Sequence, residues 1–79
     1  MTTAQLTRLI DARGMPCPGP LMSVIGAIRQ STVGDVIEVL SSDEGSKTDI
    51  PAWLQKAGHE LVEVSEEDGF ARFVVRKVR

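Results

Sequence analysis

Residues 17–28 read Cys-Pro-Gly-Pro-Leu-Met-Ser-Val-Ile-Gly-Ala-Ile, and the rest of the chain is best understood around them. Prolines are tolerated in the first turn of a helix, where backbone N–H groups have no intrahelical partner. Beyond them, apolar residues follow the i, i+3, i+4, i+7 spacing of one helix face: Leu21, Val24, Ile25 and Ile28. The stretch therefore predicts an amphipathic helix that starts after Pro20 and runs to about Gln30.

Short strands are expected on both sides of this helix, at Leu6–Asp11 and at Asp35–Ser41. In the second of them Ile37 and Val39 share one face, because successive side chains of a strand alternate between its two sides. Segments rich in polar and turn-forming residues separate the elements: Ala12–Pro20, Ser31–Asp35 and Ser42–Lys47.

A second amphipathic helix is indicated by the same apolar spacing further along the chain: Ile50, Trp53, Leu54 and Ala57. Asp49 is expected to cap its N-terminus, since a carboxylate can accept from free backbone N–H groups. Pro51 would then lie in the first turn, and Gly58 would end the helix.

The remaining residues predict a β-hairpin made of strands Glu60–Ser65 and Phe70–Val78. The link Glu66–Gly69 contains the Asp68-Gly69 pair that is typical of a tight turn between strands. The predicted order is therefore βαβαββ. Because each helix is apolar on one side only, both should cover one face of a four-stranded mixed sheet, which gives a two-layer α/β sandwich of the α+β class.

The other face of this sheet would be open to water. Charged residues of the predicted strands can lie there, and opposite charges on neighbouring strands would pair weakly. These residues are Glu38, Glu63, Arg72 and Arg76.

The composition fits one intracellular domain that spans residues 1–79. Hydrophobic residues make up 42% of the chain, but no apolar run approaches the about 18 residues that cross a membrane. The N-terminal residues lack the apolar stretch of a signal peptide, so we expect a cytoplasmic protein. The net charge of −2 argues against direct binding of nucleic acid.

Cys17 is the single cysteine, so the chain forms no internal disulfide. A lone cysteine is often a small buried hydrophobe, but this one is flanked by proline at the mouth of a predicted helix. The helix dipole favours a thiolate there, and the thiolate is the form that attacks sulfur. Arg13 and Lys47 would add positive charge if the fold brings them near. These observations favour a reactive cysteine.

The pattern Asp11-x-x-Gly14-x-x-Cys17-Pro18-x-Pro20, followed by an amphipathic helix, resembles the TusA/SirA-like family of sulfur carriers. The resemblance extends from about Leu9 to Lys77 and implies the same two-layer sandwich. It implies a sulfurtransferase-type relay protein, in which Cys17 accepts sulfur as a persulfide and passes it on. The expected donor is a cysteine desulfurase or rhodanese, and the acceptor is a further protein. The family serves tRNA thiolation, molybdenum-cofactor supply and sulfur oxidation.

The other motif residues receive supporting roles. Asp11 is expected to fix the loop through backbone hydrogen bonds, and Gly14 to supply a turn that needs a positive φ. Met15 and Met22 flank the cysteine and are candidates for a soft apolar docking rim. Relatives often place a basic residue directly before Asp-Ile-Pro, where this chain has Thr48 preceded by Lys47.

His59 is the only histidine and is expected to lie at the end of the second helix, away from Cys17. One cysteine and one histidine do not fill a tetrahedral zinc shell, so neither a metal nor another cofactor is expected.

Two other classes of function compete with sulfur transfer. A non-catalytic regulatory or RNA-binding module of the same fold is one, and the negative charge and the absence of tyrosine argue against it. A thiol redox protein is the other, and the missing second cysteine of a Cys-x-x-Cys pair argues against it. A monomer or weak dimer is expected.

Overall fold

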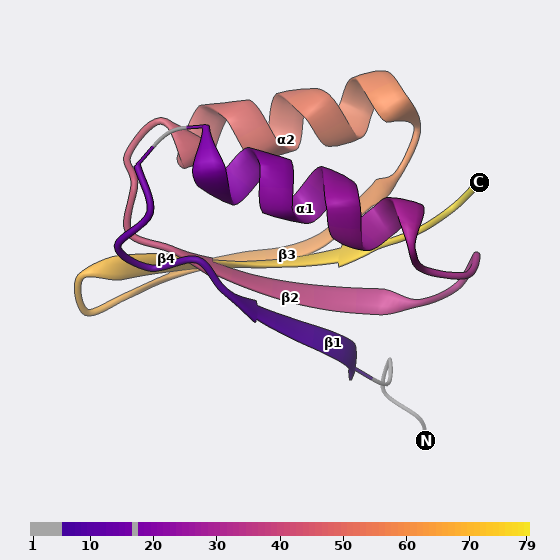
Figure 1. Cartoon of the computed structure of the whole chain (residues 1–79), viewed down its shortest axis with the longest axis horizontal. Helices are drawn as coiled ribbons and strands as arrows, with labels where there is room; N and C mark the ends of the chain where they lie inside the picture. The colour runs from indigo at the N-terminus through magenta and orange to yellow at the C-terminus, as the bar shows by residue number, and fades with distance from the viewer. Residues whose placement is uncertain (1–5, 17) are drawn as a thin grey trace.

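The computed structural model describes residues 6–16 and 18–79. Within these residues six elements follow one another in the predicted order (Figure 1). They are β1 (Leu6–Asp11), α1 (Gly19–Arg29), β2 (Val36–Ser41), α2 (Ser46–Ala57), β3 (Glu60–Glu67) and β4 (Phe70–Arg76).

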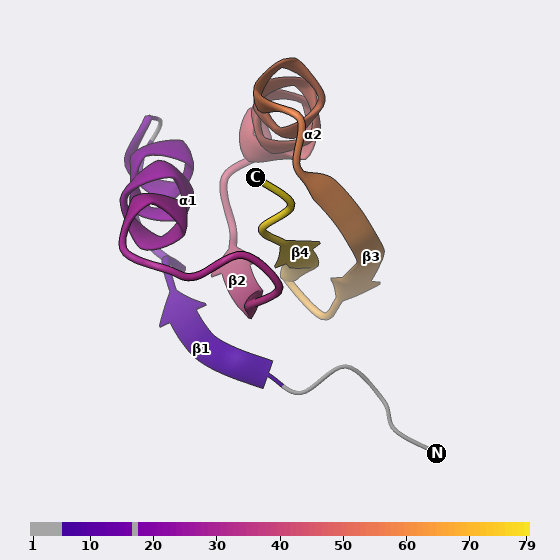
Figure 2. The same ribbon diagram turned by 90° about the vertical axis from the view of Figure 1, so that its right-hand side faces the viewer.

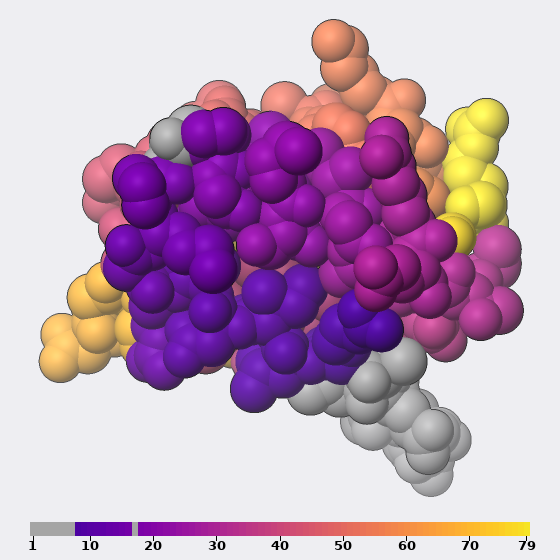
Figure 3. All heavy atoms as spheres, viewed as in Figure 1, coloured from indigo at the N-terminus to yellow at the C-terminus, as the bar shows by residue number. Residues whose placement is uncertain are grey.

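The four strands form a mixed sheet in the order β1-β2-β4-β3. β1 and β2 are parallel, whereas β4 is antiparallel to both of its neighbours. Figure 2 shows α1 and α2 side by side on the same face of this sheet. In the space-filling view of Figure 3, α1 lies directly above β1 on the face that is drawn. The predicted two-layer sandwich is therefore confirmed. Figure 1 also shows that both helices begin at the end of the molecule where β1 and β2 finish.

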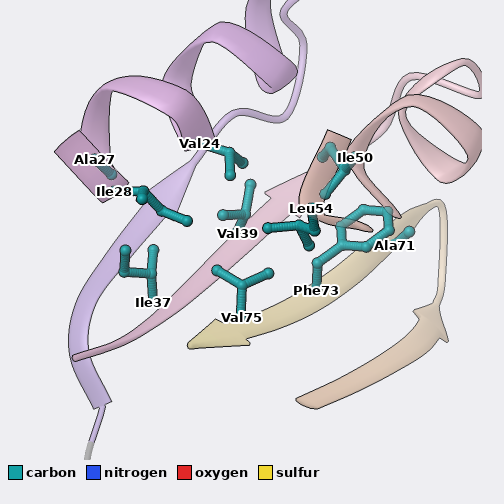
Figure 4. Packing of buried hydrophobic residues seen from close by; sticks show 10 residues of the cluster. All are labelled: Val24, Ala27, Ile28, Ile37, Val39, Ile50, Leu54, Ala71, Phe73 and Val75. Carbon is teal, nitrogen blue, oxygen red and sulfur yellow. The ribbon is translucent and has the colours of Figure 1, made fainter. Parts of the chain in front are cut away.

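The hydrophobic core lies between the helices and the two central strands (Figure 4). Each of these four elements contributes side chains that are at most 5% exposed. They are Val24, Ala27 and Ile28 of α1, Ile37 and Val39 of β2, Ile50 and Leu54 of α2, and Ala71, Phe73 and Val75 of β4. Of the predicted stripes, Val24, Ile28, Ile50 and Leu54 lie in this core, and Leu21 and Trp53 pack against it. Ile25 and Ala57 are only partly buried and lie outside it, and Ala27, which was not predicted, takes part instead.

α2 begins three residues before Asp49, so the prediction of an Asp49 cap is wrong. Asp43 accepts hydrogen bonds from the Ser46 backbone N–H at 3.1 Å and from its hydroxyl at 3.3 Å. This carboxylate satisfies a free N–H group at the helix start, as a capping residue does. Pro51 consequently lies inside the helix instead of in its first turn. The C-terminus is as predicted, since Gly58 ends α2 with a left-handed φ of 84°.

α1 also begins earlier than expected, at Gly19, so that Pro20 occupies the second helical position and is buried. At its other end Lys77 donates from Nζ to the carbonyl oxygens of Ile28 and Ser31, each across 2.8 Å. A cation at this end compensates the negative pole of the helix dipole. The chain after β4 therefore anchors the C-terminal end of α1.

The open face of the sheet carries the predicted charge pairs. Arg72 of β4 donates to Glu38 of β2 at 2.5 Å and to Glu63 of β3 at 3.0 Å. Arg76 pairs with Glu60, which lies directly opposite it on β3 and was not among the residues predicted for this face. These long side chains lie on the same face as Val36 and Val74, which are only 4% and 7% exposed.

The hairpin turns at Asp68 and Gly69, as predicted, but its strands differ in length from the expectation. β3 continues to Glu67, two residues beyond the predicted end, and β4 stops at Arg76 instead of Val78. Beyond β4 the Lys77 backbone still donates to the Asp35 carbonyl at 3.0 Å and accepts from the Gly34 N–H at 2.8 Å, while its side chain reaches the end of α1.

Candidate functional site

The candidate site is the loop between β1 and α1, which carries the Cys-Pro-Gly-Pro motif. Cys17 itself lies outside the described residues, but the residues on both sides of it are described. The Gly19 N–H donates to the Pro16 carbonyl at 2.7 Å, and the Met22 N–H donates to the Pro18 carbonyl at 2.9 Å. The chain before and after position 17 is thus hydrogen-bonded to the first turn of α1.

The N-terminus of α1 keeps its positive electrostatic character. Pro18 occupies the N-cap position, no side-chain cap hydrogen bond is made there by the described residues, and the first turn contains no acidic residue. At α2, by contrast, the Asp43 carboxylate is bound at the helix start, and Asp49 lies in the first turn. Of the two helix starts at this end of the molecule, that of α1 is therefore the one suited to stabilise an added anion.

The loop before Cys17 is held by a series of hydrogen bonds. The N–H of buried Ala12 donates to the Leu40 carbonyl at 2.8 Å, which continues the pairing of β1 with β2. Asp11 accepts from the Arg13 N–H at 3.2 Å. Gly14 has a φ of 86°, which favours glycine, and its N–H donates to the Ser42 hydroxyl at 2.9 Å.

The Arg13 side chain contacts the Asp11 carboxylate and the Phe70 ring. Its guanidinium donates to both oxygens of Asp11, each at 2.8 Å, and its Cζ lies 4.9 Å from the centre of the Phe70 ring. The hydrogen bonds from the Arg13 side chain are the main cause that lowers the pKa of Asp11 to about 2. The positive charge of Arg13 is thus neutralised locally by Asp11.

Lys47 is also paired. Its Nζ lies 2.8 Å from a carboxylate oxygen of Glu66 in β3 and 3.3 Å from one of Glu44. The hydrogen bond to Glu66 is the largest cause that raises the pKa of Lys47. Lys47 therefore joins the start of α2 to the end of β3, and two carboxylates neutralise its charge. Thr48, beside it, is exposed.

Met15 and Met22 both present surface to solvent, with 41% and 58% of each residue exposed. Met15 lies along the first turns of α1, where the Ser23 hydroxyl is 3.9 Å from its sulfur. A Cβ added at Gly19 would lie 3.1 Å from the Cβ of Met15. The close approach of Met15 to the helix therefore depends on a glycine at position 19.

His59 lies at the opposite end of the molecule, after the C-terminus of α2. Its Nδ1 accepts from the Val78 N–H at 3.2 Å, and its ring centre lies 5.8 Å from that of Trp53. Burial is the main cause that lowers the pKa of His59, and the charges of Lys77 and Arg79 lower it further. Among the described residues no group of three or more His, Cys, Asp or Glu side chains is arranged to hold a metal ion.

Sequence reasoning missed three residues that hold this end of the molecule together. Ser42 binds the loop before Cys17, Glu66 binds Lys47, and Phe70 lies under Arg13. No local sequence pattern predicts these contacts, because each joins segments that are far apart in the sequence. Asp43 was missed as well, because it lies three residues before the first residue of α2 and the N-cap position itself is Gly45.

Comparison with known proteins decides the family. The family model described as sulfurtransferase TusA matches residues 8–77. The chain belongs to the TusA family. Within the part of the chain that is described, neither helix is long and apolar enough to cross a membrane.

Relatives of the TusA family cover nearly the whole chain. A protein of Archaeoglobus fulgidus named "Putative sulfur carrier protein" is 58% identical over 71 residues, which are 90% of this chain and 97% of that protein. The sulfur carrier protein TusA of Pseudomonas aeruginosa is 35% identical over 75 residues, which are 95% of each chain. Sulfur transfer is therefore the general role of the family to which the chain belongs.

A solved structure supports the fold independently. The crystal structure of the SirA-like protein from Desulfitobacterium hafniense superposes with a TM-score of 0.82 and 23% sequence identity. The match covers 92% of this chain and all of the other. At this level of identity the likeness concerns the fold, and it agrees with the sandwich that the TusA family resemblance implies.

Proposed function

We propose that this chain is a sulfur carrier that holds sulfur as a persulfide on Cys17 and relays it between two proteins. The observation that carries the proposal is the position of the Cys-Pro-Gly-Pro motif in a TusA-family chain. It precedes a helix whose first turn has no carboxylate and whose start is fixed by hydrogen bonds from Gly19 and Met22.

The proposed reaction is a thiol exchange. The Cys17 thiolate attacks the terminal sulfur of a persulfide on the donor, so that a new S–S bond forms at Cys17 while the donor's S–S bond breaks. The donor leaves as a thiolate, and the persulfide on Cys17 retains the proton or loses it to water. No net oxidation occurs, because one S–S bond replaces another. Transfer to the acceptor repeats this exchange in the opposite sense.

The start of α1 supplies the electrostatic stabilisation in this proposal. Thiolates at helix N-termini have lowered pKa values, because the helix dipole favours the anion. Arg13 and Lys47 are each paired with carboxylates, so we assign them a structural role in holding the loop, α2 and the hairpin together. The helix, not a free basic side chain, would favour the thiolate.

Partner proteins would bind around the motif, with exposed Met15 and Met22 as apolar contacts. A cysteine desulfurase or a rhodanese is the donor class that presents a persulfide. The three pathways expected from the family share this transfer step, so the proposal concerns the step itself. We place it in the cytoplasm, where a lone thiol stays reduced.

Intact-protein mass spectrometry tests the proposal. The reduced chain is incubated with a persulfide-loaded cysteine desulfurase or rhodanese and then separated from it. The wild type should gain the mass of a sulfur atom that a reductant removes, and Cys17→Ser should gain nothing. Ser31→Ala, altered at the far end of α1, serves as a matched control and should load like the wild type. Absence of the adduct in the wild type with both donor classes would overturn the proposal.

A further inference from the structure

The loop before Cys17 is bound to a side chain from another part of the fold. Ser42, in the segment between β2 and α2, accepts a hydrogen bond from the Gly14 N–H at 2.9 Å. Gly14 stands three residues before Cys17 in the motif and adopts a φ of 86°. The contact thus holds the loop at the turn that contains Gly14.

Neighbouring hydrogen bonds make this contact part of a rigid arrangement. Directly before Ser42 lies Ser41, a residue that is only 1% exposed and whose hydroxyl accepts from the Asp43 N–H at 3.2 Å. Directly after it, the Asp43 carboxylate accepts from the Ser46 N–H at the start of α2. Ser42 therefore projects from a segment that is fixed on both sides, and the loop that binds it is held relative to α2.

The Gly14 contact completes the support of the loop from β1 to α1. The loop is tied at its start by the Ala12 N–H to the Leu40 carbonyl, and at its end by the Gly19 N–H to the Pro16 carbonyl. Between these two points the Met15 N–H donates to the Ala12 carbonyl at 3.2 Å within the loop, and Ser42 supplies a side-chain contact from outside it. Since the stabilisation of a thiolate by a helix falls off within the first turn, small displacements of the loop change it.

We propose that Ser42 is a positioning residue for Cys17, which holds the preceding loop so that the thiolate stays at the start of α1. The inference rests on the proposed function of Cys17. Loss of the Ser42 hydroxyl would let the loop move away from α2. Cys17 would then spend less time at the helix start, its thiol pKa would rise, and its reaction with sulfur donors at neutral pH would slow.

The decisive comparison is between two variants of the same shape. Ser42→Thr retains a hydroxyl, whereas Ser42→Val has the same branched form without one. Ser42→Ala is the simple truncation, and Ser31→Ala removes a serine hydroxyl that donates to the Ala27 carbonyl at the other end of α1. Thermal unfolding of each variant establishes that it is folded.

The readout is the rate of Cys17 alkylation by iodoacetamide between pH 5 and pH 10, in the range where thiols ordinarily titrate. Ser42→Val and Ser42→Ala should shift the midpoint to higher pH and slow alkylation at pH 7 by about two- to tenfold, as expected for the loss of one hydrogen bond. Ser42→Thr and Ser31→Ala should follow the wild type. Hydrogen exchange of the Gly14 amide should accelerate in the Val and Ala variants.

Two results would overturn the inference. One is an alkylation profile of Ser42→Val that coincides with that of Ser42→Thr, whether or not the Gly14 amide exchanges faster. The other is an equal shift in Ser31→Ala, which would indicate general loosening of α1. Alkylation needs no sulfur donor, so a wild type that alkylates as described but accepts no sulfur would refute the relay and leave the role of Ser42 intact.

Discussion

Arg13 binds both carboxylate oxygens of Asp11, with its Nε and Nη2 each 2.8 Å from one of them. The backbone N–H of Arg13 donates to the same carboxylate at 3.2 Å. One aspartate thus closes the turn that leads out of β1 and also neutralises the arginine. This arrangement explains why an acid can stand in a motif whose cysteine is proposed to work as an anion.

The first prediction concerns the titration of Asp11. Its pKa is lowered from 3.8 to about 2, with the side-chain hydrogen bonds of Arg13 as the largest cause. Because the folded pKa is depressed, the contribution of Asp11 to stability is present above about pH 4 and is lost as the pH falls toward 2. NMR titration of the side-chain carboxyl carbon should show a midpoint near 2 that returns toward 3.8 in Arg13→Gln. An unchanged midpoint in this variant would contradict the assignment.

The second prediction concerns Arg72 on the open face of the sheet. Glu38, its partner, has a side chain that is only 18% exposed. Arg72→Met should therefore lower the free energy of unfolding by about 1–2 kcal/mol, since a half-buried carboxylate loses its partner. Arg76→Met is the control: both members of the Arg76–Glu60 pair are nearly half exposed, and the loss should stay below about 1 kcal/mol. Equal losses in urea denaturation would show that burial does not set the difference.

The third prediction concerns Gly26 in the middle of α1. A Cβ at this position would meet no atom within 4 Å, so the structure gives no packing reason for glycine there. Gly26→Ala should raise the free energy of unfolding by about 0.5–1 kcal/mol, because alanine loses less conformational freedom in a helix. Gly19→Ala is the comparison variant and should not show the same gain in the free energy of unfolding, because its Cβ would lie only 3.1 Å from the Cβ of Met15. Urea denaturation checks both, and a destabilised Gly26→Ala would refute the prediction.

The fourth prediction concerns pH and the C-terminal segment. His59 accepts a hydrogen bond from the Val78 N–H only while its Nδ1 is unprotonated, and burial lowers its pKa from 6.5. Since the unfolded chain binds the proton more readily, this contribution is complete above about pH 6.5 and is lost as the pH falls through the lowered folded pKa. The Val78 amide signal should shift over the same range.

His59→Asn tests the source of this effect, because its side-chain oxygen can replace Nδ1 as an acceptor and does not titrate. The stability of this variant should change less between pH 7 and pH 5 than that of the wild type. The same loss in both proteins would assign the pH dependence to other groups.

The sequence predicted the features of the fold that depend on local periodicity. The stripes led by Val24 and Ile50 face the core because helix packing buries whichever side is apolar. Gly58 ended α2 as expected, since few other residues adopt its backbone conformation. The N-terminus of α2 was predicted wrongly at Asp49. The helix starts three residues earlier, at Ser46, whose N–H donates to the Asp43 carboxylate.

The motif of the candidate site could be predicted from the sequence, but the contacts that hold the surrounding loop could not. Cys17 and the prolines could be recognised because they form a short motif of adjacent residues. The contact between Gly14 and Ser42 joins positions 28 residues apart, and no sequence pattern in either segment indicates that the two will meet. The pairing of Lys47 with Glu66 likewise depends on where the hairpin meets α2, which only the folded chain determines.

The measurement that most directly tests the relay is cyanolysis of the sulfur-loaded chain. Cyanide attacks the outer sulfur of a persulfide, breaks the S–S bond, and yields thiocyanate and the original thiolate. Because Cys17 is the only cysteine, the account predicts one thiocyanate per loaded chain, return to the unmodified mass, and recovered ability to be loaded again. Thiocyanate yields that are equal in wild type and Cys17→Ser, or a loaded chain that releases none, would contradict the claim that Cys17 carries transferable sulfur.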